Sequence, residues 1–388
     1  MFKKFFSSEI ITTGLAIFSM FFGAANLMFP LKVGLSSGTH LAWGIAGFLL
    51  TGVLIPFAGL IAIILFQGDY TQFFYRLGRI PGFLFIAFCL IAAGPLIAMP
   101  RIVTFSYTVL TPFFPTLSLF AFCLIFLALT FWATYKESKI VDFLGNIISP
   151  VLLLGLAIII VKGYFTSAQP IVVTNTAAKV FWDNIIAGYQ TLDILAGILF
   201  SAIVITILQK NYSSPGKPSF KHLAMLSFQA GLVGVGLLAL VYIGLAYLGA
   251  YHGHGLESIN EGELFSAVSQ RILGQHGALI IATTVLMACY STIIALTAVF
   301  SEFLNTQIFN GKLGYIPAVL ITLGLTLITS LFGLSSILAF SKPIIIITYP
   351  ALITLTFFNI AYKIFNVKPI KIPVAITLII SSISYFWY

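Results

Sequence analysis

The stretch IITTGLAIFSMFFGAANLMFP, residues 10–30, decides how this chain can fold. Up to Phe22 it is long and apolar enough for a membrane helix, but GAAN at residues 23–26 then interrupts it and Pro30 follows. Glycine and alanine tolerate an unwound backbone, which inside a bilayer is possible only where it is buried in protein or lines a cavity. The stretch therefore predicts either a broken helix that binds something small beside Asn26, or a glycine-kinked helix packed tightly on a neighbour.

The composition identifies a membrane protein that crosses the bilayer several times. Of 388 residues, 60% are hydrophobic and only 7% are charged, a balance with which a soluble domain could not keep its surface hydrated. The net charge of +9 does not indicate nucleic acid, because the basic residues lie singly or in pairs between apolar runs, as topology signals do. The three cysteines lie within apolar runs without metal-type spacing, so we expect them to be packing residues.

Eleven apolar runs are long enough to span the membrane, which takes about 20 residues each. If the N-terminus is cytoplasmic, thirteen Lys and Arg residues fall in inner segments and five in outer ones, while Arg101 lies inside the third run. This asymmetry is expected of a correct span count and orientation, and it leaves Tyr388 outside. The runs cover residues 10–31, 41–66, 83–110, 117–135, 140–161, 180–208, 222–248, 277–305, 315–332, 341–362 and 372–388.

The longest outer connection, residues 249–275, carries three glutamates and an amphipathic pattern up to Val268. Two interpretations stand: a short surface helix over the outer mouth, or an ordinary solvated loop. His252 and His254 resemble a metal pair, but because no third ligand is nearby in the sequence we expect a turn there.

The sixth run, residues 180–208, repeats the theme of the first. It contains GYQTLD at 188–193, and Asp193 lies about ten residues in, near 15 Å deep at about 1.5 Å per residue. Of the ten carboxylates in the chain, it is the only one placed near mid-depth, where a carboxylate marks an ion path, a substrate contact or a partnered structural site. We expect it to cap the inner half of a broken helix and shape the site rather than to bind a ligand directly.

The eighth run, residues 277–305, offers a pair of hydroxyls at its middle. Ser291 and Thr292 are adjacent and the Ala288 carbonyl is one turn back, so three hard oxygen donors suited to a small cation lie together. Alone, such hydroxyls mostly bond the carbonyl four residues back in their own helix. Together with two broken helices five spans apart, they predict two inverted five-helix repeats around a central site.

The predicted fold is an all-α polytopic membrane protein with a single transmembrane domain of about 11 helices, of which helices 1 and 6 are broken. The first repeat covers residues 10–162, the inverted second repeat covers residues 180–363, and residues 369–388 form an additional C-terminal helix. The half-helix N-termini at the breaks would face an anionic group, and the free carbonyls would face a cation.

Five motifs spread along the chain resemble those of a known family. They are the run from Gly14 to Pro30, GPLIAMPR at 94–101, GYQTLD at 188–193, ACYST at 288–292 with Glu302 and Phe303, and Ser341, Lys342, Pro343, Tyr349 and Pro350. The chain resembles the bacterial branched-chain amino acid:cation symporters of the BrnQ type over nearly its whole length. The resemblance implies a LeuT-type fold and sodium-coupled uptake of leucine, isoleucine and valine across the cytoplasmic (inner) membrane. The family usually has twelve spans where this chain has eleven, and the twelfth lies outside the inverted repeat.

The resemblance also implies which residues form the site. In that fold, one sodium site uses two carbonyls from the first helix and a carbonyl and two hydroxyls from the eighth, and Asn26 matches an asparagine near the substrate carboxylate. The implied Na+ ligands are Ser19, Phe22, Ala288, Ser291 and Thr292. The two breaks supply the expected substrate-binding residues: Gly23, Ala24, Ala25, Asn26, Gly188, Tyr189, Gln190, Thr191 and Asp193.

Other functions compete with this hypothesis. An intramembrane enzyme would need a nucleophile with a base, or a metal cluster, at mid-depth, but all five histidines lie in loops or at span ends. A channel would show rings of charge or a repeated filter loop, and the sequence has neither, although a single subunit of an oligomer need not show them. Within the transporter class, proton coupling and other apolar substrates such as methionine stay open, because one methylene changes binding by only about 1–3 kcal/mol. The sequence does not determine the oligomeric state.

Overall fold

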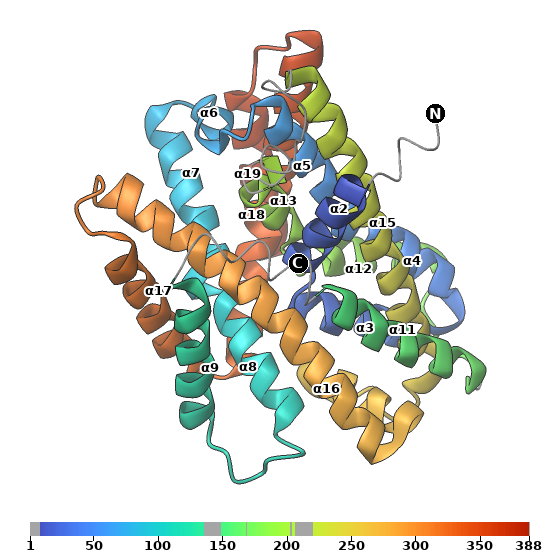
Figure 1. The fold of residues 1–388 in the computed structure, drawn as a ribbon. Coiled ribbons are helices and arrows are strands. Elements are labelled where there is room, and N and C mark those ends of the chain that lie inside the picture. The colour runs from blue at the N-terminus through green and yellow to red at the C-terminus, as the bar shows by residue number, and fades with distance from the viewer. Residues whose placement is uncertain (1–7, 136–148, 168, 202–203, 206–219, 388) are drawn as a thin grey trace.

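The structure, a computed structural model, describes residues 8–135, 149–167, 169–201, 204–205 and 220–387. Within these residues every regular element is a helix, and the helices pack into one bundle (Figure 1). In chain order they are α2 (Ser8–Phe21), α3 (Ala24–Ser37), η1 (Gly38–His40), α4 (Leu41–Leu49), η2 (Leu50–Leu54), α5 (Ile55–Leu65), α6 (Tyr70–Tyr75), α7 (Arg79–Ile91), η3 (Ala92–Leu96), α8 (Ala98–Leu110), α9 (Leu119–Thr134), α11 (Ser149–Phe165), α12 (Ala177–Tyr189), α13 (Asp193–Leu199), α15 (Phe220–His252), α16 (Glu261–Phe303), η6 (Leu304–Ile308), α17 (Tyr315–Ser330), α18 (Leu334–Phe365) and α19 (Lys371–Trp387).

The lengths and compositions of these helices are those of a membrane protein. In the described part of the chain, five helical stretches are long and apolar enough to cross a bilayer. Five further apolar helices are shorter, with 10–17 residues. The expected all-helical membrane class is therefore seen, while the count of eleven spans and the inverted repeats stay predictions. The five long stretches are Ala24–Leu65, Arg79–Leu110, His222–His252, Gly277–Ile308 and Leu334–Phe365.

The first predicted break is present but shorter than expected. Helix α2 ends at Phe21 and α3 begins at Ala24, so only Phe22 and Gly23 lie between them, and Gly23 is extended with φ −122° and ψ −160°. The helix restarts at once because the Asn26 side-chain carbonyl accepts the Gly23 N–H at 3.0 Å and satisfies a donor that the helix start would leave unpaired.

The second predicted break separates α12 from α13. Helix α12 ends at Tyr189 and α13 begins at Asp193, with residues 190–192 between them. Leu192 has a φ of +63°, in the left-handed region that a branched side chain rarely adopts. A non-glycine residue held there is strained, and such strain concentrates at functional sites.

A third break lies where the sequence analysis expected one continuous run. Within η3, Gly94 has φ −90° and ψ −128°, and Pro95 follows it. Proline has no backbone N–H and its ring clashes with the preceding turn, so the helix is interrupted here. On α17, the Thr329 hydroxyl donates to the Pro95 carbonyl at 2.7 Å. Helix α8 begins after the break and carries the buried Arg101 in its first turn.

Helix α15 packs directly against both halves of the first run. A Cβ atom on Gly34 of α3 would lie 1.8 Å from the Ala246 carbonyl oxygen, and one on Gly249 of α15 would lie 2.1 Å from the Leu31 carbonyl oxygen. Two backbones approach this closely only through small residues, which are typical of helix interfaces in membranes. The contact presents Tyr242 of α15 to the first break.

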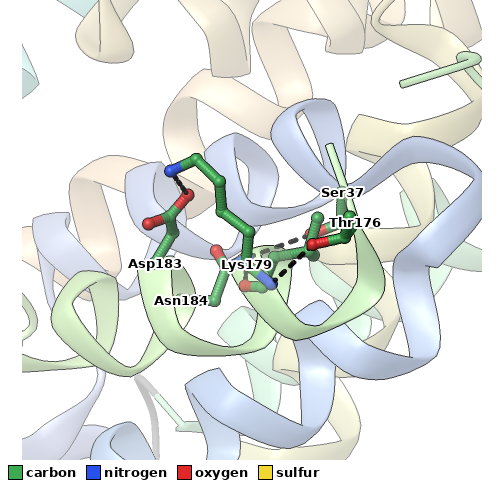
Figure 2. Close-up of polar contacts among 6 residues, drawn as sticks. Ser37, Thr176, Lys179, Asp183 and Asn184 are labelled. Carbon is green, nitrogen blue, oxygen red and sulfur yellow. Dashed lines mark hydrogen bonds and ion pairs between the residues drawn. The ribbon is translucent and has the colours of Figure 1, made fainter. Parts of the chain in front are cut away.

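Helix α12 is anchored at its start and tied to the end of α3 (Figure 2). Thr176 caps the helix by accepting the Lys179 N–H at 3.3 Å, and Lys179 pairs with Asp183 at 2.8 Å on the exposed face. On the buried face, the Asn184 amide donates to the Ser37 hydroxyl at 3.2 Å. This bond holds α12 beside the end of α3.

The outer connection contains a helix rather than a solvated loop throughout. Helix α16 begins at Glu261, deviates at Gly274 (φ +71°, ψ 179°) and then continues across the bundle beside α8 and α9 (Figure 1). Phe265 and Val268 are buried, so the amphipathic pattern packs its apolar side inward. Both histidines of the expected turn form hydrogen bonds with backbone carbonyls. His252 Nε2 lies 2.8 Å from the Gly163 oxygen, and His254 Nε2 lies 2.8 Å from the Gln169 oxygen.

Candidate substrate and cation site

A cavity lies where the first and sixth runs break. Its wall is formed by the end of α2, the start of α3, the connection from α12 to α13 with the first turns of α13, the start of α8 and the middle of α16. Most of the lining side chains are apolar, and a few polar groups converge among them, which is the usual composition of a small-molecule site.

Asn26, Asp193 and Tyr242 form a buried hydrogen-bond network beside this cavity. The Asn26 amide nitrogen lies 2.8 and 2.9 Å from the two Asp193 carboxylate oxygens and also contacts the Tyr242 hydroxyl. The Tyr242 hydroxyl donates to Asp193 Oδ2 at 2.6 Å. Hydrogen bonds to a charged group are stronger than neutral ones, so this network joins the inner half of the sixth run to α3 and α15.

The expectation that Asp193 caps the inner half-helix is wrong in its detail. Asp193 is itself the first residue of α13, and its carboxylate accepts from the side chains of Asn26 and Tyr242 rather than from backbone N–H groups. The Ile194 N–H at this helix start instead donates to the Tyr349 hydroxyl of α18 at 3.1 Å. The site-shaping part of the expectation agrees with the structure, because the carboxylate links three helices.

Five oxygen atoms that the sequence analysis assigned to a sodium site lie together in the structure. The Ser291 hydroxyl is 3.1 Å from the Ser19 carbonyl and 2.8 Å from the Ala288 carbonyl. The Thr292 hydroxyl is 3.1 Å from the Phe22 carbonyl and 3.2 Å from the same Ala288 carbonyl. We call this group, formed by Ser19, Phe22, Ala288, Ser291 and Thr292, the oxygen cluster.

The break in the first run explains why α2 has carbonyls to spare. In an uninterrupted helix the Gly23 N–H would donate to the carbonyl four residues back, which is that of Ser19. Here it donates to Asn26 Oδ1 instead, and the Ser19 carbonyl accepts from Ser291. The Asn26 side chain therefore caps the start of α3, leaves the Ser19 carbonyl free to accept from Ser291, and donates to Asp193.

The oxygen cluster fits a monovalent cation by its chemistry. All five oxygen atoms are neutral and belong to buried residues. The two hydroxyl groups can rotate to turn a lone pair toward a bound ion. Ser19 Oγ is also buried and has no hydrogen-bond partner among the described residues. A neutral oxygen set suits a monovalent ion better than a strongly hydrated divalent one. The described residues contain no group of three or more His, Cys, Asp or Glu side chains that could hold a metal.

The expected substrate-binding residues fall into two groups. Residues 23–26, Thr191 and Asp193 line the cavity. Gly188 and Tyr189 lie behind its wall: a Cβ atom on Gly188 would be 2.0 Å from the Thr51 hydroxyl, and the Tyr189 ring packs on Tyr349 with centroids 4.9 Å apart. Gln190 also lies behind the wall, where it contacts Arg101.

Three residues near the cavity had no role in the sequence analysis. Tyr242 lies in a mostly aliphatic run that also contains Phe228 and Tyr247, and one aromatic residue among others is a weak signal because most such residues simply pack. Tyr349 was noted only as part of a motif. Arg101 was noted as an arginine inside the third run, and its fully buried position in the cavity wall is the strongest signal that sequence reasoning left unused.

The arrangement of the helices, with a cavity between broken elements, is the LeuT-type fold. MhsT, solved in complex with L-phenylalanine, superimposes with a TM-score of 0.60 at 18% identity, over 98% of both chains. The inward-facing form of Mhp1 superimposes with a TM-score of 0.61 at 14% identity, over 97% of this chain and 90% of that one. These likenesses show the fold.

The family follows from the sequence relatives. The pattern of the family described as "Branched-chain amino acid transport protein" matches residues 6–386, and the chain belongs to this family. Over 366 residues it is 33% identical to the branched-chain amino acid permease BraB of Bacillus subtilis, covering 92% of this chain and 81% of that protein. It is 30% identical to the permease BrnQ of Escherichia coli K12, over 90% of this chain and 80% of the relative. These relatives are transporters, which implies that the chain is a multi-pass membrane protein and not an enzyme.

Proposed function

We propose that this protein is a secondary active symporter that imports leucine, isoleucine and valine by alternating access. The inward movement of Na+ down its gradient would drive this uptake. The observation that carries the proposal is that the oxygen cluster and the cavity share the first break. Thr292 lines the cavity and also donates to the Phe22 carbonyl, and Gly23 lies between the two sites. A cation held by the cluster would fix the backbone that forms the cavity wall, so binding of ion and substrate would favour each other.

The cavity wall supports an apolar amino acid as the substrate. Met20, Phe21, Ile102, Leu195 and Leu296 contribute hydrophobic surface to it. Branched aliphatic side chains gain about 25 cal/mol per Å² of apolar surface removed from water in such a site. One methylene more or less changes binding by only about 1–3 kcal/mol, so methionine and other apolar amino acids are the secondary substrates to test.

Proton coupling is a second candidate, and one observation favours it. Asp193 is a fully buried carboxylate in the cavity wall, and carboxylates at such positions serve as proton relays in many transporters. In that case Asp193 would exchange a proton during each cycle, and the oxygen cluster would be helix packing only.

The proposed transporter lies in the inner-membrane lipid bilayer of a bacterium. Its N-terminus is proposed to face the cytoplasm. The expected partners are the amino acid and the lipid, and no nucleic acid. The thirteen-to-five asymmetry of basic residues supports this orientation. Part of that set, including Lys3, Lys4, Lys136, Lys139, Lys210 and Lys217, lies outside the described residues.

Uptake of radiolabelled leucine into proteoliposomes tests the proposal. An inward Na+ gradient should drive saturable accumulation, unlabelled isoleucine and valine should compete, and preloaded leucine should give counterflow, which a channel would not. An inward proton gradient without Na+ should drive little uptake. Accumulation that persists after both gradients are collapsed would contradict symport, and uptake driven by protons alone would favour the second candidate.

A further inference from the structure

Two opposite charges are buried in the cavity wall, and neither has a partner of opposite sign among the residues that the structure describes. The Arg101 side chain is 1% exposed and Asp193 is 2% exposed, and both line the cavity. Burying an unpaired charge is costly, because water no longer solvates it. The ion pairs among the described residues lie elsewhere and join Lys32 to Glu261 and Lys179 to Asp183.

The Arg101 guanidinium is held by neutral acceptors and keeps a donor to spare. Its Nη1 donates to the Gln190 carbonyl at 3.0 Å, and its Nη2 donates to Gln190 Oε1 at 3.3 Å and to the Ser341 hydroxyl. Its Nε is buried and has no partner among the described residues. An arginine has five N–H donors arranged to bind carboxylates, so this side chain is positioned by the sixth and tenth runs while a charge-assisted donor remains free.

The Asp193 carboxylate is held in the same way by neutral donors. Its Oδ2 accepts from both Asn26 and Tyr242, and its Oδ1 accepts from Asn26. An ionised carboxylate has about four lone-pair sites, so Oδ1 can accept another hydrogen bond. A cationic donor there would neutralise a charge that amide and hydroxyl groups only solvate.

Asn26 is not available to bind a substrate carboxylate, although the family resemblance suggested that it lies near one. Its Oδ1 accepts the Gly23 N–H, and its amide nitrogen, which has only two hydrogens, already faces both Asp193 oxygens and the Tyr242 hydroxyl. Among the described residues, Arg101 Nε is a buried donor of the cavity wall that has no partner.

We propose that Arg101 binds the carboxylate of the transported amino acid and Asp193 binds its ammonium group, so that the zwitterion supplies both missing counter-charges. The inference rests on the proposed function and deepens it, because it assigns the recognition of the amino acid backbone to two side chains. Both side chains lie at the break of the sixth run, because Arg101 donates to the Gln190 carbonyl and Asp193 follows Gln190 by three residues. The apolar remainder of the wall is left to the substrate side chain.

Competition against Na+-driven leucine uptake in proteoliposomes tests this assignment with two leucine analogues. L-leucinamide lacks the carboxylate charge, and 4-methylpentanoate lacks the ammonium. A hydrogen bond to a charged group is worth about 1.5–3 kcal/mol, so leucine should inhibit wild-type uptake about 10–150-fold more tightly than either analogue. Arg101→Gln should reduce the advantage of leucine over leucinamide to about threefold or less, and Asp193→Asn should do the same for 4-methylpentanoate.

The matched control is Arg79→Gln, which removes the same charge from an exposed position at the start of α7 and should keep both ratios at the wild-type value. An unchanged leucine-to-leucinamide ratio in Arg101→Gln would overturn the inference while leaving the proposed function intact. Absence of leucine uptake by the wild type would instead overturn the proposed function. If Arg101→Gln does not fold, Arg101→Lys provides the test. It should weaken the binding of leucine more than the binding of leucinamide, and equal weakening of the two would contradict the assignment.

Discussion

At the scale of single residues, Asn26 shows how one side chain organises a site. Its carbonyl oxygen takes the Gly23 N–H and its amide group faces Asp193, so the break in the first run and the charge in the sixth depend on the same residue. The Ser19 carbonyl that this releases accepts from Ser291, on a helix more than 250 residues away in the sequence. Loss of any one group would therefore alter both the oxygen cluster and the cavity wall.

The hydroxyl pair gives the residue-scale prediction. Thr292→Ala removes one oxygen of the cluster and should cost about 1 kcal/mol, which is roughly a fivefold increase in the Na+ concentration for half-maximal leucine uptake. Ser291→Ala should act similarly, and Thr292→Ser, which keeps the hydroxyl, should change the value little. Apparent leucine affinity should fall at low Na+ and recover at high Na+, because coupling between two ligands is reciprocal.

Thr297→Ala is the control for this experiment. Thr297 is buried in the same helix and donates to the Ile293 carbonyl at 2.7 Å, so its removal loses a hydroxyl of the helix-packing kind. It should leave the Na+ dependence unchanged. If both alanine variants in the cluster behave like Thr297→Ala, the hydroxyl pair is only helix packing.

At the scale of the helices, the broken elements are held in place by neighbours that approach through glycine. Gly34 and Gly249 let α3 and α15 touch backbone to backbone, and Gly47 of α4 does the same against α12, where an added Cβ atom would lie 2.3 Å from the Phe181 carbonyl oxygen. A half-helix has fewer internal hydrogen bonds than a full span, so it depends more on such packing. Small residues therefore stabilise the very helices that the site interrupts.

Two glycines of α15 provide a test in which the same substitution should have opposite effects. Gly249→Ala would place a methyl group 2.1 Å from the Leu31 carbonyl oxygen, and overpacking of this kind costs about 1–3 kcal/mol. Gly236→Ala meets nothing within 4 Å and should be neutral or stabilising by up to about 1 kcal/mol, because alanine favours helix over glycine. Melting temperatures of the purified variants in one detergent measure this. A Gly249→Ala protein as stable as Gly236→Ala would show that the two helices are not in close contact.

At the scale of the whole molecule, contacts agree with the predicted sidedness of the chain. Lys32 and Glu261, both assigned to outer segments, lie 3.8 Å apart. Arg76 and Lys368, both assigned to inner segments, are joined by a 3.0 Å hydrogen bond from the Arg76 guanidinium to the Lys368 carbonyl, and Arg76 also stacks 3.7 Å from the centroid of the Tyr362 ring. Such contacts show which segments share a side, and the distribution of lysine and arginine predicts which side is the cytoplasm.

Cysteine labelling in intact cells tests the orientation. The three native cysteines are buried, so the wild type should label weakly and need not be changed. Lys179→Cys should react with a membrane-impermeant maleimide from outside, and Lys312→Cys should react only after the cells are permeabilised, since both lysines are exposed. The reverse pattern would mean that the N-terminus faces outward.

The membrane class and the break at Gly23 could be predicted from the sequence, because they depend on local chemistry: runs of apolar residues, and glycine and alanine at an interruption. The pair of hydroxyls at Ser291 and Thr292, one turn after the Ala288 carbonyl, was also visible in the sequence, whereas Ser19 and Phe22 were added to it by the family resemblance. The position of Asn26 three residues after Gly23 also follows from the sequence, and a capping interaction at that spacing depends only on neighbouring residues.

Contacts between side chains that are distant in the sequence became known only from the folded chain. Tyr242 contacts Asp193 from 49 residues away, and Arg101 grips Gln190 from 89 residues away. Helical periodicity shows which face a residue occupies but not which neighbour that face will meet, because packing of whole helices sets the partner. For this reason the sequence analysis assigned Asp193 to the nearest backbone, whereas the folded chain places it among the side chains of two other helices.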